Sequence, residues 1–176
     1  MKNMYYAGIG SRKTPPEILE AFKSIASYLA LKGFILRTGG ASGADSAFEI
    51  GCNKNHGKKE IFLPWNRFNN NSAKMIPLSE EAMELAKFYH PNWIHLSEEA
   101  RKMMARNCYQ VLGANLKSPV GFILCYTPNG NGSGGTGQAI RIATDRHIPI
   151  IDAGKYYDAN VFKRNVWRFL QENYNL

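Results

Sequence analysis

The sequence predicts an α/β fold: a single doubly wound, Rossmann-like domain with a mostly parallel β-sheet covered by helices on both faces. Three observations lead to this prediction. Short apolar runs alternate along the chain with longer stretches whose apolar residues recur at a helical period. Most of the runs are short and apolar, as in strands buried on both faces of a sheet. Turns rich in glycine follow several of them, which is typical of strand–helix connections in such folds.

Apolar, aromatic and β-branched residues identify the predicted strands, and glycine, proline or a polar turn ends each of them. In chain order, the predicted strands cover residues 4–9, 34–38, 59–64, 119–126 and 148–151. Pro149 cannot donate a backbone hydrogen bond, so we expect it at the start of its strand or on an unpaired side. Residues 65–78 follow no period and are expected to form a loop.

Helical spacing and capping residues identify the predicted helices. In the first helix, Thr14 is the expected N-cap, Pro15 the first helical residue and Glu17 the partner in a capping box, and Gly33 follows the last turn. Ser97 is a candidate cap of a later helix. In chain order, the predicted helices cover about residues 15–32, 46–53, 79–88, 97–113, 138–146 and 158–174.

Length and composition are those of an ordinary globular protein. The chain has 176 residues, of which 44% are hydrophobic and 20% charged, so residues 1–176 are expected to form one domain around one core. No apolar run reaches the ~18 residues that span a bilayer, and no signal peptide is visible. The three cysteines are far apart and fit neither a disulfide framework nor a metal site. We therefore expect a cytoplasmic protein without membrane contact, metal or cofactor.

The formal net charge of +8 favours anionic partners such as nucleotides, nucleic acids or anionic surfaces. The basic residues are scattered and form pairs, such as Lys58-Lys59, with no long run. Solvated helix surfaces account for most of them. Charge by itself therefore favours nucleic-acid binding only weakly.

Three glycine-rich or polar turns follow predicted strands, at residues 8–12, 39–45 and 133–137. Since the carboxyl ends of parallel strands lie at one edge of a sheet, we expect these turns to converge there. Two of them open helices, where free N–H groups and the helix dipole favour an anion. Arg12 adds a guanidinium suited to a phosphate or carboxylate. The turns therefore predict a site for a phosphate-bearing ligand, with structural turns that bind nothing as the alternative.

The same turns resemble the SLOG superfamily of Rossmann-like nucleotide-binding domains. It includes the DNA-processing protein A group, the LOG phosphoribohydrolases, molybdenum-cofactor carrier proteins and sensor domains of bacterial defence proteins. Residues 10–12 resemble the superfamily's first-strand turn, and residues 39–45 are similar to the second-strand turn of the DNA-processing group. Residues 101–102 and 133–137 resemble the Arg-Lys helix and the last glycine turn of LOG enzymes. The resemblance covers roughly residues 5–151.

This resemblance implies binding of a nucleotide or nucleotide-derived small molecule by a carrier, sensor or sequestering protein. It also implies a homo-oligomer, because SLOG relatives often associate. The expected ligand-binding residues are Gly10, Ser11, Arg12, Gly39, Gly40, Ser42, Gly43, Asp45, Arg101, Gly134, Gly135, Thr136 and Gly137.

One departure from the LOG pattern bears on catalysis. LOG enzymes have a glutamate after the last glycine turn that is taken to act in cleaving the N-glycosidic bond, whereas the matching stretch here begins with Gln138 and has no carboxylate. Asp45 and Glu49, one helical turn apart, are the candidate catalytic carboxylates. Their structural alternatives are that Asp45 caps the helix and that Glu49 faces solvent. A nucleotide N-glycosidic-bond hydrolase or transferase is thus an alternative function. A single-stranded DNA-binding module is another.

Overall fold

The computed structural model describes residues 3–176 and is built on a five-stranded sheet. Every strand is parallel to its neighbours, in the order β3-β2-β1-β4-β5. The strands are β1 (Tyr5–Gly10), β2 (Ile35–Thr38), β3 (Lys59–Ile61), β4 (Phe122–Tyr126) and β5 (Ile150–Asp152). The predicted α/β class and parallel sheet are confirmed.

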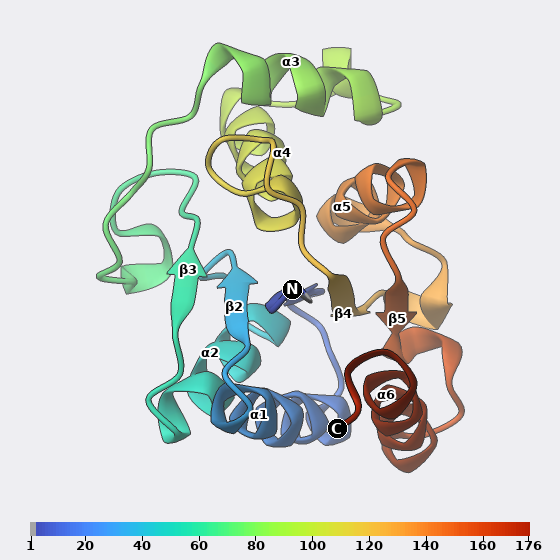
Figure 1. Ribbon diagram of the computed structural model, residues 1–176. Helices are drawn as coiled ribbons and strands as arrows, with labels where there is room; N and C mark the ends of the chain where they lie inside the picture. The colour runs from blue at the N-terminus through green and yellow to red at the C-terminus, as the bar shows by residue number, and fades with distance from the viewer. Residues whose placement is uncertain (1–2) are drawn as a thin grey trace.

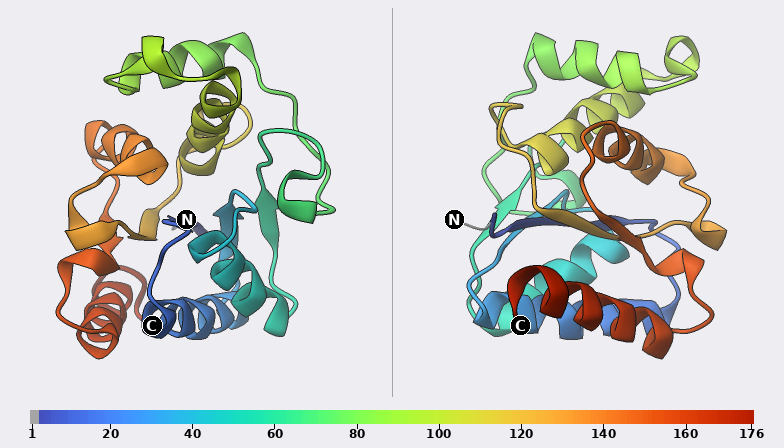
Figure 2. Two further views of the ribbon diagram at one scale, coloured as in Figure 1. Left: turned by 180° about the vertical axis from the view of Figure 1, so that it is seen from behind. Right: turned by 45° about the vertical axis from the view of Figure 1, so that its right-hand side comes forward.

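Helices cover both faces of this sheet. They are α1 (Pro16–Leu31), α2 (Ala44–Lys54), α3 (Glu80–Tyr89), α4 (Glu98–Leu112), α5 (Gly134–Asp145) and α6 (Ala159–Tyr174). Figure 1 shows α1, α2 and α6 below the sheet and α4 and α5 above it, with α3 lying over α4; the right-hand view of Figure 2 shows the same layers from the side. None of the helices within residues 3–176 is long and apolar enough to cross a bilayer.

Each face of the sheet has its own apolar core. Aromatic rings fill the core between the sheet and the helices α1, α2 and α6. Phe22 stacks on Phe48 with ring centroids 4.2 Å apart, and Tyr6 stacks on Phe122 with centroids 5.6 Å apart. The opposite core is mainly aliphatic and lies between the sheet and the pair α4–α5. A fully buried side chain of these kinds contributes about 1.5–3 kcal/mol. The two cores therefore hold the carboxyl edge of the sheet in a fixed shape.

The first helix begins differently from the prediction. Thr14 is not its N-cap: Pro15 is the capping residue, with no side-chain bond to the helix, and Pro16 opens α1. The Thr14 hydroxyl instead donates to the Ser11 carbonyl at 2.6 Å. Pro15 is held extended because the ring of a following proline disfavours the helical region for the residue before it. At the other end, Gly33 has φ +81° just after the last turn, as expected.

The helices after the glycine-rich turns begin earlier than expected, because those turns already contain helical residues. α2 starts at Ala44 and α5 at Gly134, so the glycines of the third turn form the first turn of α5. Ser97 caps α4 as predicted, accepting from the Ala100 N–H. The edge strands differ as well: β3 ends at Ile61, and β5 starts directly after Pro149 and includes Asp152.

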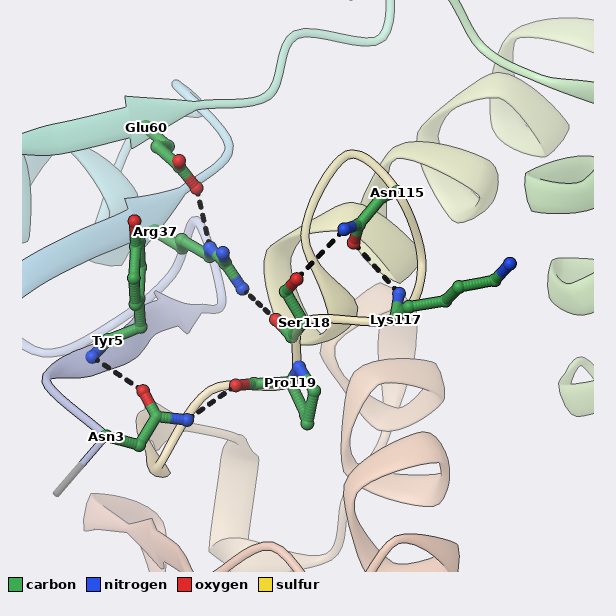
Figure 3. A network of polar contacts seen from close by, with 8 residues as sticks. All are labelled: Asn3, Tyr5, Arg37, Glu60, Asn115, Lys117, Ser118 and Pro119. Carbon is green, nitrogen blue, oxygen red and sulfur yellow. Dashed lines mark hydrogen bonds and ion pairs between the residues drawn. The ribbon is translucent and has the colours of Figure 1, made fainter. Parts of the chain in front are cut away.

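A buried arginine, Arg37, connects three strands with the loop that follows α4 (Figure 3). Arg37 on β2 is 3% exposed and pairs with Glu60 on β3 at 2.6 Å. Its guanidinium also donates to the Ser118 carbonyl at 2.5 Å and lies 4.2 Å from the ring centroid of Tyr5. These contacts tie the loop after α4 to three strands. Tyr5 begins β1 and Ser118 precedes β4, so these contacts lie toward the amino ends of the strands, away from the carboxyl edge.

Candidate functional site

A cavity of about 370 Å³ lies at the carboxyl ends of β1 and β4. From β1 the chain crosses to β2 on one side, while from β4 it crosses to β5 on the other. Ligands of open parallel sheets bind at such a switch point. The walls come from the turn after β1, the start of α2, the middle of α4, the loop after β4 and the first turn of α5.

The structure brings together about half of the residues expected to bind a ligand. The expected residues that line the cavity are Gly10, Ser11, Arg12, Asp45, Gly134, Gly135 and Thr136. They come from the first and third turns, apart from Asp45. These two turns therefore converge as the topology predicts.

The glycines of the second turn pack against protein atoms instead. A Cβ at Gly39 would overlap the Arg106 and Gln110 side chains, one at Gly40 would overlap Leu63, and one at Gly43 would overlap the Arg12 backbone. The expected residues that lie outside the cavity lining are Gly39, Gly40, Ser42, Gly43, Arg101 and Gly137. In this turn the glycines allow other parts of the protein to pack closely against the backbone.

The second turn also uses its own N–H groups. The Ala41 N–H donates to the Asp45 carboxylate at 3.3 Å, and the Ala44 N–H donates to the Ser11 carbonyl at 3.4 Å. A carboxylate and a carbonyl of the protein thus occupy N–H groups that a phosphate would need. The start of α5, where Gly134, Gly135 and Thr136 line the cavity, is the better place for an anion.

Asp45 and Arg106 form a buried pair of opposite charges at the cavity. Asp45 is 4% and Arg106 5% exposed. Burial raises the pKa of Asp45 to about 6, although Arg106 and the N–H groups of Ala41, Gly39 and Gly10 oppose the shift. Burial likewise lowers the pKa of Arg106 to about 10. The guanidinium also donates to the Gly39 carbonyl and, at 3.1 Å, to that of Phe62.

Arg12 carries the charge best placed for a ligand. Its guanidinium lines the cavity and donates at 3.5 Å to the Met103 sulfur. A thioether is a weak acceptor, so a phosphate would compete successfully for these donors. Lys13 adds a second positive charge to the same wall.

Two other candidates have structural partners away from the cavity. Arg101 lies over the Trp93 ring, 5.4 Å from its centroid, and donates to the Trp93 carbonyl at 3.3 Å. Glu49 pairs with Lys59 at 2.8 Å and accepts from Asn71 at 3.0 Å. Both therefore hold neighbouring segments together.

Gln138, where LOG enzymes have a glutamate, is fully buried and donates to the Met104 carbonyl at 2.8 Å. It lies outside the cavity lining. The side chain at this position therefore points into the packing between α4 and α5.

Sequence reasoning missed three polar residues of α4. Arg106, Asn107 and Gln110 all line the cavity, and each is at most 6% exposed. Asn107 accepts from Arg106 at 3.0 Å and donates to the Gly135 carbonyl at 3.0 Å, which connects the buried pair to α5. The available signal was the position of Gln110, three residues after Asn107 and four after Arg106, which places it beside both on the helix surface.

Neither a protein-family model nor a curated protein sequence matches the chain. Among solved structures, it is similar to the molybdenum cofactor carrier protein of Chlamydomonas reinhardtii, with 14% identity, a TM-score of 0.43, and coverage of 97% of this chain and 99% of that one. It is also similar to DNA processing protein A of Helicobacter pylori, described as binding single-stranded DNA, with 14% identity, a TM-score of 0.43, and coverage of 96% and 82%. Likenesses this distant carry no information about the ligand.

Proposed function

We propose that the protein binds a nucleotide or nucleotide-derived small molecule and holds its phosphate at the first turn of α5. The observation that carries the proposal is that Arg12, Lys13 and the start of α5 line one cavity at the switch point of the sheet. A helix N-terminus favours an anion, and a guanidinium binds phosphate with two parallel hydrogen bonds. The cavity volume of about 370 Å³ is that of a small-molecule site.

The proposed ligand class is the one expected from the sequence, but the proposed phosphate site is the first turn of α5 and not the 39–45 turn. The 39–45 turn holds the Asp45 carboxylate through its own N–H groups, so the third turn takes the anion. Such a site suits a carrier, a sensor or a sequestering protein of the SLOG type, in which the ligand is bound and released unchanged.

Thr136→Glu is expected to weaken the binding of nucleoside monophosphates at least tenfold. Thr136 is the third residue of α5 and lines the cavity. A glutamate there repels a phosphate, yet it interacts favourably with the helix dipole, so thermal stability should not fall. Isothermal titration calorimetry with AMP, GMP, CMP and UMP measures the change, and Thr136→Ser is the matched control. Unchanged affinity in the glutamate variant would place the phosphate elsewhere.

A second candidate function is hydrolysis of the N-glycosidic bond of a nucleotide, and the state of Asp45 favours it. A carboxyl whose pKa is about 6 can act as a general acid or base near neutral pH. Asp45 lines the same cavity as the proposed phosphate turn. The leading proposal needs no bond cleavage, so the two candidates differ in whether free base is released.

If the protein is such a hydrolase, it should release free base from at least one nucleoside monophosphate, and Asp45→Asn should abolish the release while nucleotide binding persists. The rate should change around pH 6, where Asp45 titrates. Chromatography of the reaction products measures the base. Absence of turnover over the four common monophosphates between pH 5 and pH 8 would leave binding as the function.

A further inference from the structure

Gln110 is a buried amide without a partner in the protein. It lies on α4, is 3% exposed, and lines the cavity. Within residues 3–176, its side chain forms no hydrogen bond with another residue, and its amide atoms are not enclosed by protein but open into the cavity. Nearly all buried polar groups in proteins are hydrogen-bonded, because an unpaired one loses the bonds that it makes in water. Water in the cavity can bond this amide in the free protein, and a ligand that enters the cavity can take its place.

The surroundings of Gln110 keep its amide at the cavity. A side chain at Gly39 would occupy the space of the Gln110 amide nitrogen and the Arg106 guanidinium, so the glycine makes room for both. Asp45 faces the same cavity from α2 and is also buried. The cavity thus has an amide that can donate and accept, and a carboxylate that accepts when ionised.

Apolar side chains complete this part of the wall. Ile9, Met103, Met104 and Pro128 line the cavity together with the polar groups. Methionine sulfur makes favourable contacts with aromatic rings, and apolar walls with a few placed polar groups are typical of sites for ring-containing ligands. A sugar phosphate would leave these walls without apolar contacts, whereas a flat heterocycle would fill the space between them.

We propose that Gln110 recognises the hydrogen-bonding edge of a nucleobase, so that the ligand is a base-bearing phosphate rather than a sugar phosphate. The inference rests on the proposed function and adds the recognition of the base. A primary amide has a donor beside an acceptor in one plane, which matches an edge with an acceptor beside a donor, as glutamine matches adenine in nucleic acid complexes. Asp45 accepts from an amino group or ring N–H of the same base.

The test compares the wild type with Gln110→Leu, which has a similar size and no amide. Calorimetry gives the affinities for AMP, GMP, CMP, UMP and ribose 5-phosphate. The wild type should bind at least one of the four nucleotides ten times more tightly than ribose 5-phosphate, and Gln110→Leu should bring this ratio to within threefold. Gln171→Leu, an exposed position on α6, is the matched control and should keep the wild-type ratio.

Thermal unfolding of the free proteins gives an independent readout. Because the amide bonds no other residue, Gln110→Leu should leave the unfolding midpoint unchanged or slightly higher, whereas replacing a glutamine with a structural role would lower it. A lowered midpoint, or a ratio that survives the substitution, would overturn the inference while the proposed function stands. If the wild type binds neither ribose 5-phosphate nor any of the nucleotides, the proposed function is wrong and this inference fails with it.

Discussion

Arg106→Met should lower the free energy of unfolding by about 2–6 kcal/mol, because it leaves two buried carbonyls without a donor and each unsatisfied group costs about 1–3 kcal/mol. The substitution leaves the Asp45 carboxylate without its counter-charge and the Gly39 and Phe62 carbonyls without a donor. Urea denaturation at pH 7 measures the loss. Arg106→Lys is the matched control, since it keeps the charge and should lose less.

The loss from Arg106→Met should grow with pH. The pKa of Asp45 is already raised from 3.8 to about 6, and removing Arg106 takes away a charge that opposes this shift. A carboxyl with a raised folded-state pKa stabilises the fold below its unfolded value, and this stability is lost as the pH rises through the folded value. The variant should therefore lose more stability between pH 5 and pH 8 than the wild type does. Equal losses would show that Arg106 and Asp45 do not interact.

Arg12→Ala should weaken the binding of nucleoside monophosphates by about 10- to 100-fold, because a charge-assisted hydrogen bond contributes about 1.5–3 kcal/mol. The native fold should be unaffected, because the guanidinium bonds only weakly, to the Met103 sulfur. Calorimetry with the same nucleotides measures the change. Arg164→Ala, on the exposed side of α6, removes the same charge far from the cavity and should leave the affinity unchanged. If the two substitutions weakened binding equally, Arg12 would act only through the net charge of the protein and not through contact with the phosphate.

The fold was predictable because its signals are local. Short apolar runs marked most of the strands, helical spacing marked the helices, and parallel strands require their carboxyl ends to meet at one edge. The errors arose where neighbouring chemistry overrides a pattern. Thr14 looked like a helix cap, but Pro15 is held extended by Pro16 and caps instead.

The site was only partly predictable because several of its residues depend on distant contacts. Gly39 appeared suited to approach a phosphate, whereas in the structure it makes room for Arg106 and Gln110, about seventy residues along the chain. Polar residues within a helix usually face solvent, so the composition of α4 did not indicate that three of its polar side chains are buried at the cavity. Arg12 and the start of α5 were identified because both belong to glycine-rich turns in the connections that follow β1 and β4.

A crystal structure with a bound nucleoside monophosphate tests the central claim most directly. The proposal predicts phosphate oxygens within hydrogen-bond distance of the Gly135 and Thr136 N–H groups and of the Arg12 guanidinium, with the base beside Gln110. A phosphate bound instead on the 39–45 turn, with the Asp45 carboxylate displaced from the Ala41 N–H, would contradict it.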